Sequence, residues 1–200
     1  MHGIDRWSGW LAALLLVLAV AGFGAALRDY SQLLHPVTWL GADGIPHAWG
    51  FNLLGLVLPG ALAMLVAVRL RQHLPAQAGW AARVGSQMLL LAGLAFLAMG
   101  LLPLDIEDQA GMQGPDSKLH ASAWMAWALA FIVGGLLLGL ERLRDPAGRR
   151  LGALALACAV IAGLASFVLP GLLPAALAQR LALACWALWL AAALPLSRPR

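Results

Sequence analysis

Charged residues are scarce in this 200-residue chain. Only 11% of its residues are Asp, Glu, Lys or Arg, and 62% are hydrophobic, whereas about a quarter of the residues in soluble domains carry charge. The mean hydropathy of +0.83 is correspondingly high. These values exclude an ordinary soluble domain and indicate an integral membrane protein.

Cysteine is also rare, and the usual metal-binding spacings are missing. The two cysteines, Cys158 and Cys185, both fall inside apolar runs, and the chain has no CxxC, HExxH or HxxxH. A disulfide framework or a thiolate cluster is therefore not indicated. We expect both thiols to act as small buried hydrophobes.

What the chain has in abundance is long apolar runs. About 20 apolar residues are needed to cross a hydrocarbon core of roughly 30 Å, and helices satisfy their backbone polar groups within the segment. The sequence predicts an all-α bundle of six transmembrane helices forming a single domain over residues 1–200. The predicted spans are 7–27, 49–68, 84–102, 120–140, 151–169 and 174–196. Recurrent glycines in these spans predict close helix packing, and Pro59 predicts a kink.

The basic residues predict the orientation of the bundle. With both termini in the cytoplasm, ten arginines lie on the cytoplasmic side, and only Arg28, Lys118 and Arg180 lie on the other. This asymmetry follows the positive-inside rule, and it explains the net charge of +4 without a nucleic-acid partner. We therefore expect a multi-pass protein of the inner (cytoplasmic) membrane whose longer loops, near 28–48 and 103–119, are extracytoplasmic.

These two loops and the span ends beside them hold most of the unusual polar side chains. Asp105 leaves the third span close to membrane depth, where a carboxylate is costly and suggests a function or a dedicated partner. We name Asp105 and His120 as candidate catalytic residues for acid–base work. Capping of a helix end or a loop turn is the structural alternative for Asp105.

A second group of residues is predicted to bind a ligand. It comprises His35, His47, Asn52, Trp124 and Trp127. The two tryptophans lie on the same helix face as His120, one and two turns deeper in the span. They therefore line an aromatic pocket or, alternatively, form a packed aromatic seam. Arg180, at the start of the last span, can snorkel to the headgroups or hold a lipid phosphate or a loop carboxylate.

No cofactor is expected in the main interpretation, and zinc is the alternative. A catalytic zinc site needs about three protein ligands and an open position. His35, His47, Asp105 and His120 are the candidate ligands. Because their spacing matches no metal motif, solvated or hydrogen-bonded loop histidines are the competing interpretation.

Two stretches resemble the prokaryotic membrane family catalogued as domain of unknown function 998. They read "TWLGADGIPHAWGFNLLGLVLPG" (38–60) and "GLLPLDIEDQAGMQGPDSKLHASAW" (100–124). The resemblance extends over essentially the whole chain as a six-helix pattern. It implies a multi-pass membrane protein without an established activity, and it marks Asn52, Pro103, Asp105 and His120 as important positions without assigned roles.

A second stretch, "SQLLH" (31–35), is similar to one element of the membrane hydrolases that include alkaline ceramidases and adiponectin-type receptors. In that superfamily a Ser, an Asp and three His serve a zinc ion, a set that Ser31, His35, Asp105 and His120 could mimic. The family has seven spans and a late HxxxH pair, whereas this chain has no histidine after His120.

We therefore expect a membrane protein that binds a lipid or small amphiphile in an outward-facing polar pocket, since apolar walls with a few polar groups typify ligand sites. Two alternatives stay open. One is a metal-dependent hydrolase of lipid amides or esters, and the other is an accessory subunit of another membrane protein. The expected partners are membrane lipid and, in the last case, that protein.

Overall fold

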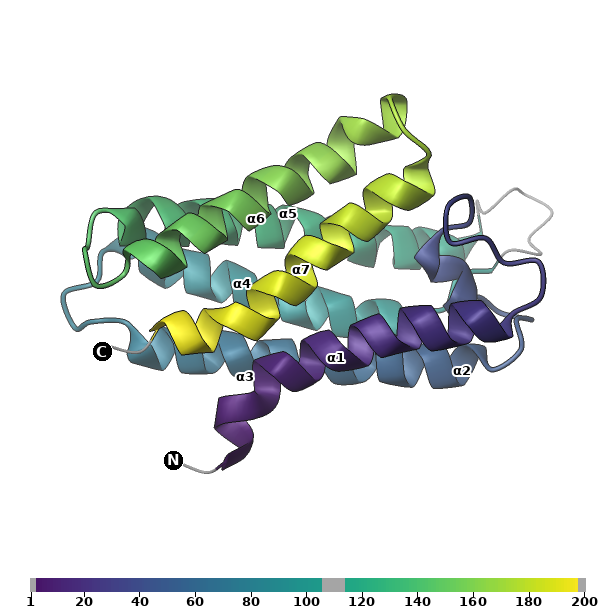
Figure 1. Ribbon diagram of the computed structural model, residues 1–200, viewed down its shortest axis with the longest axis horizontal. Helices are drawn as coiled ribbons and strands as arrows, with labels where there is room; N and C mark the ends of the chain where they lie inside the picture. Colours follow the sequence, from purple (N-terminus) through teal and green to yellow (C-terminus); the bar gives the residue numbers. More distant parts are fainter. Residues whose placement is uncertain (1–2, 106–113, 198–200) are drawn as a thin grey trace.

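The computed structural model describes residues 3–105 and 114–197, and this part of the chain is helical without any strand. Six helical stretches are long and apolar enough to cross a membrane (Figure 1). The predicted all-α bundle of six transmembrane helices is confirmed, and the chain is a multi-pass membrane protein.

The helices follow one another with short connections. In chain order they are α1 (Gly3–Ala26), α2 (Ala48–Phe51), α3 (Leu58–His73), α4 (Trp80–Leu101), α5 (Pro115–Leu143), α6 (Arg149–Phe167) and α7 (Ala175–Ser197). A π-helical segment, Asn52–Val57, joins α2 to α3 into one span. Two short 3-10 helices, Val37–Gly41 and Leu169–Gly171, lie in loops.

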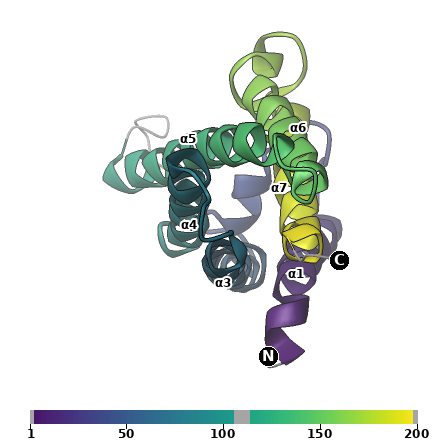
Figure 2. The same ribbon diagram turned by 90° about the vertical axis from the view of Figure 1, so that its left-hand side faces the viewer.

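Helices that are consecutive from α3 to α7 pack against each other, and α1 closes the bundle by lying beside α7 and α3. Viewed along the bundle, α3, α4 and α5 form one side, and α6, α7 and α1 form the other (Figure 2). The pairing of the first and last long helices places two segments distant in sequence next to each other. This pairing creates the groove described below.

Glycines set the closest helix contacts. A Cβ atom on Gly85 of α4 would lie 2.9 Å from the carbonyl oxygen of Gly134 in α5, and the reverse substitution meets the oxygen of Gly85 at 2.9 Å. Gly139 and Gly152 form a similar reciprocal pair between α5 and α6. At these positions the predicted role in close packing is confirmed. Gly22 has nothing within 4 Å of its added Cβ and has no such role.

The proline kink predicted at Pro59 takes the form of a change of helix type. Pro59 lies two residues after the end of the π-helical segment, in the first turn of α3. Because proline offers no N–H and crowds the preceding turn, a wider turn before it relieves the contact, and such π segments often occur at functional sites. The segment begins at Asn52, whose side chain leaves the span toward the first loop.

The start of α5 differs from the predicted span. The helix begins at Pro115 rather than near residue 120, so Asp116 and Lys118 are helical residues rather than loop residues. Proline favours the first helical turn, where its missing N–H costs nothing. Hydropathy locates only the apolar part of a helix and cannot detect this polar first turn. The loop carboxylates Glu107 and Asp108 lie outside the described residues.

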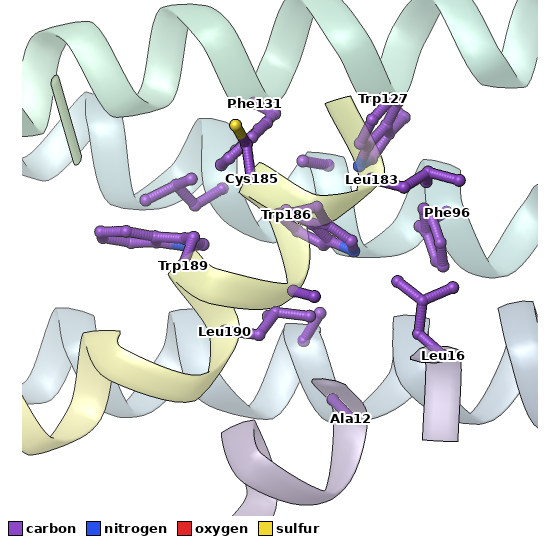
Figure 3. Close-up of a cluster of buried hydrophobic side chains, with 14 of the residues drawn as sticks. Ala12, Leu16, Phe96, Trp127, Phe131, Leu183, Cys185, Trp186, Trp189 and Leu190 are labelled. Carbon is purple, nitrogen blue, oxygen red and sulfur yellow. The ribbon is translucent and has the colours of Figure 1, made fainter. Parts of the chain in front are cut away.

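Large aromatic side chains fill the centre of the bundle (Figure 3). Trp127, Phe131 and Trp186 pack together with ring centroids 4.9 to 6.1 Å apart, and Phe96 adds a fourth ring from α4. The side chain of Trp127 is fully buried at 0% exposure. It therefore belongs to a packed aromatic seam and does not line any of the cavities described below.

Candidate binding groove between α1 and α7

Helices α1 and α7 enclose a groove of about 730 Å³ together with the first loop. Its walls come from residues 16–25 of α1 and residues 177–187 of α7, and they are almost entirely aliphatic. Three polar side chains line it, namely Tyr30, Gln32 and Arg180. The groove thus has long apolar walls and a single polar end.

The groove has the depth of one membrane leaflet. Along α7 its wall runs from Leu177 to Ala187, which is about 15 Å at a rise of 1.5 Å per residue. A bilayer hydrocarbon core is about 30 Å thick. The polar groups lie on the loop side of the groove, with Arg180 three residues after Leu177 and the Gln32 amide against Val20 and Gly24 of α1. From there to Leu16 and Ala187 the lining side chains are aliphatic.

Arg180 organises the polar end. Its Nε donates to Oε1 of Gln32 (3.1 Å), its Nη2 donates to the same oxygen (2.8 Å) and to the Tyr30 hydroxyl (2.7 Å), and its Nη1 donates to two backbone oxygens. These backbone acceptors belong to His35 (2.9 Å) and Ala176 (3.0 Å). All five guanidinium N–H groups reach neutral acceptors, and none of the described carboxylates pairs with Arg180.

Tyr30 does not supply the missing negative charge. Burial raises the pKa of its phenol, and the neighbouring Arg180 only partly opposes this effect. Tyr30 is therefore a neutral phenol at physiological pH, and its hydroxyl donates to the backbone oxygen of Pro36 at 3.1 Å. The cation of Arg180 lies half-buried among groups that carry dipoles but no charge.

Gln32 reaches the groove because α1 has a glycine beside it. The Gln32 amide nitrogen donates to the backbone oxygen of Val20 at 3.2 Å. A Cβ atom on Gly24 would overlap that amide nitrogen. Gly24 therefore provides the space in which the Gln32 side chain lies between α1 and Arg180.

Three further hydrogen bonds fix the first loop on the bundle. The backbone nitrogen of Val37 donates to Oε1 of Gln179 at 2.7 Å, and Nδ2 of Asn52 donates to the oxygen of Gly41 at 2.8 Å. The nitrogen of Asp43 donates to the oxygen of Leu104 in the second loop at 2.9 Å. The loop that roofs the polar end is thus tied to α7, to the π-helical segment and to the second loop.

The predicted ligand-binding residues His35, His47 and Asn52 lie outside the groove. His35 accepts at Nδ1 from the backbone nitrogen of Ser31 (3.0 Å), and its ring stacks on Trp39 with centroids 4.8 Å apart. His47 is exposed before α2 and has a positive φ of 62°. Asn52 is 8% exposed and serves the loop contact above. None of these three side chains lines the groove.

The hydrogen bonds described for His120 do not reach the side chain of Asp105, its predicted catalytic partner. His120 is 5% exposed, its Nδ1 donates to the carbonyl oxygen of Leu102 at 2.7 Å, and its Nε2 has no partner among the described residues. Ser117 donates to the backbone oxygen of Asp105 at 3.1 Å. The side chains of Ser117 and His120, both on α5, thus bind the backbone of the segment that follows α4. Catalysis by Asp105 and His120 stays a prediction.

The part of the chain that the structure describes contains no group of three or more His, Cys, Asp or Glu side chains arranged for a metal ion. His35, His47, Asp105 and His120 are all described, and they do not form such a group. The zinc alternative therefore gains no support from this arrangement and stays a prediction.

Trp124 lies apart from the groove. It lines a smaller cavity of about 210 Å³ that also contacts Ser166 and Gln179. The hydroxyl of Ser166 is buried and has no hydrogen-bond partner within the described residues. Of the five predicted ligand-binding residues, Trp124 is the one that borders a described cavity.

The sequence marks Arg180 as a residue that can snorkel to the headgroups or hold a lipid phosphate or a loop carboxylate, but it does not single out Gln32, Gly24 or the apolar walls. Gln32 is the one amide side chain of the first loop before Asn52, which is a weak signal. The residues that form the apolar walls of the groove cannot be recognised in the sequence, because leucine, valine and alanine are common throughout the spans.

Comparison with known proteins adds one match. The family model described as "Protein of unknown function (DUF998)" matches residues 11–194. No curated protein and no solved structure matches the chain.

Proposed function

The chain belongs to the DUF998 family of proteins of unknown function, and we propose that it binds a membrane amphiphile in the groove between α1 and α7. The observation that carries this proposal is the groove itself, with about 730 Å³ of mostly apolar space that ends at Arg180, Gln32 and Tyr30. Ligand sites in proteins typically have about 300–1,000 Å³ and apolar walls with a few polar groups.

The position of the groove favours a ligand that arrives from the bilayer. Its walls belong to two membrane-spanning helices, so a ligand lying in it continues the orientation of a lipid in one leaflet. The arginine-rich end of the bundle is expected in the cytoplasm, and the groove lies toward the opposite end. The leaflet beside the groove is then the outer leaflet of the cytoplasmic membrane. The protein then acts as a lipid-binding module.

Filling the groove is expected to remove the bound amphiphile. Ala184 lines the groove and is exposed, so a tryptophan there occupies the apolar space without entering the helix packing. Native mass spectrometry after purification in a mild detergent should show lipid on the wild type and at least about tenfold less on Ala184→Trp, equivalent to about 1.4 kcal/mol.

Ala126→Trp is the matched control, because Ala126 is exposed on α5 and lies outside the groove. It should retain as much lipid as the wild type, and both variants should keep the wild-type unfolding temperature. Equal lipid retention by Ala184→Trp and wild type contradicts the proposal. Loss of lipid in both tryptophan variants would point to general binding at the protein surface instead.

A further inference from the structure

The contact between Gln32 and Arg180 has the geometry of an anion site filled by a neutral group. Oε1 of Gln32 accepts from both Nε and Nη2 of Arg180, at 3.1 and 2.8 Å. This edge of a guanidinium is a fork that carboxylates and phosphates bind through two parallel hydrogen bonds. In this structure a single amide oxygen occupies the fork, and it brings no charge to the half-buried cation.

We propose that Gln32 holds the place of an anionic lipid headgroup, and that a phosphate or carboxylate of the lipid displaces it from Arg180. The proposal rests on the proposed function, since the same groove receives the acyl chain. It adds the chemical class of the ligand and the residue that the ligand replaces.

The remaining contacts allow this exchange without loss of the guanidinium position. The other edge of Arg180 stays bound to the Tyr30 hydroxyl and to the oxygens of His35 and Ala176. Gln32 itself gives up one amide hydrogen bond to the oxygen of Val20. That oxygen lies inside α1, where the helix already supplies a donor four residues later.

The apolar walls select a lipid over a free anion. Beyond Gln32 and Tyr30, the groove continues between α1 and α7 with aliphatic side chains only. A free phosphate gains nothing from these walls, whereas a lipid buries its acyl chain there. The polar end and the walls together therefore fit an anionic lipid whose headgroup lies at the loop end.

Isosteric substitution of Gln32 tests the exchange. Gln32→Glu places a carboxylate on the fork, so the protein supplies its own anion. It should reduce binding of phosphatidylglycerol at least tenfold without lowering the unfolding temperature. Gln32→Ala empties the fork and should bind phosphatidylglycerol at least as tightly as the wild type. A loss of binding in Gln32→Glu without a loss in Gln32→Ala is not expected from a residue that only supports the loop.

Native mass spectrometry of the full chain measures these effects. The protein is titrated with phosphatidylglycerol or with diacylglycerol of the same acyl chains, which has neither a phosphate nor a carboxylate. The wild type should prefer phosphatidylglycerol at least about tenfold, and glycerol phosphate should compete only weakly. If glycerol phosphate binds as tightly as phosphatidylglycerol, the site binds a free anion, and the assignment to a lipid headgroup is wrong.

The outcomes separate this inference from the proposed function. If both lipids bind equally to wild type and Gln32→Glu, and Ala184→Trp still removes them, the groove binds amphiphiles and the headgroup assignment is wrong. The assignment is also wrong if Gln32→Ala loses binding as fully as Gln32→Glu. If Ala184→Trp leaves binding unchanged, the groove is not the site and both proposals are wrong.

Discussion

Replacing Arg180 by leucine is expected to abolish lipid retention and to release the first loop from α7. The substitution removes five donors at once and leaves the Tyr30 hydroxyl, the Gln32 amide oxygen and the His35 carbonyl without them. Hydrogen bonds to charged groups contribute about 1.5–3 kcal/mol each. Because Arg180 is only half-buried, solvent screening reduces this sum, and we expect a total loss of stability of about 2–3 kcal/mol.

Two measurements follow the two consequences of this substitution. Trypsin cleavage after Arg28 should become faster in Arg180→Leu because the loop is less firmly held, and native mass spectrometry should show no bound lipid. Arg180→Lys keeps the charge but offers a point charge in place of the fork, so it should retain part of the lipid binding and little of the loop protection.

Arg144→Leu is the matched control for these variants. Arg144 is exposed at the opposite end of the bundle, just after α5, and it should match the wild type in cleavage and in lipid retention. Unchanged lipid retention in Arg180→Leu would contradict the role of Arg180 in lipid binding. Unchanged cleavage would contradict the role of Arg180 in holding the loop.

Substitution of Gly134 by leucine is expected to separate α4 from α5 and to prevent stable folding. Even a single Cβ atom at this position would lie 2.9 Å from the oxygen of Gly85 and 3.1 Å from the nitrogen of Leu89. Both atoms belong to helix backbone and cannot rotate away. Overpacking usually costs about 1–3 kcal/mol, and the cost is larger where the backbone must move.

The effect should increase with side-chain size and depend on position. Gly134→Ala should lower the unfolding temperature measurably, and Gly134→Leu should reduce the yield of monodisperse protein to near zero. Gly22→Leu is the control, because nothing lies within 4 Å of an added Cβ there, and it should behave as the wild type. Equal behaviour of Gly22→Leu and Gly134→Leu would show that helix propensity, rather than interhelical contact, determines the effect.

The transmembrane architecture was predictable because a bilayer imposes length and polarity rules on each span separately. Six apolar runs of sufficient length identify six helices without any knowledge of contacts between them. Details that depend on polar residues or neighbours were not accessible in this way. The first turn of α5 is polar and begins at Pro115, and the π-helical segment before Pro59 is a local response to the proline.

The candidate site was predictable only in part because it depends on contacts between distant segments. Arg180 contacts Tyr30 and Gln32 across about 150 positions of sequence, and no local pattern indicates that α1 lies beside α7. The sequence points to Asp105 and His120 because carboxylates and histidines are rare near the spans. In the structure, His120 holds the end of α4 through Leu102, which is a role that residue type alone does not reveal.

Photolabelling with an anionic lipid can locate the bound lipid on the protein. A phosphatidylglycerol carrying a photoreactive group near the end of one acyl chain can be crosslinked to the purified protein, and the labelled peptides can be identified by mass spectrometry. We expect labelling of α1 near Leu16 and of α7 near Ala187, which form the deep end of the groove. This labelling should be lost in Ala184→Trp. Labelling spread evenly over the lipid-facing sides of α3 to α6, or unchanged in Ala184→Trp, would contradict lipid binding in the groove.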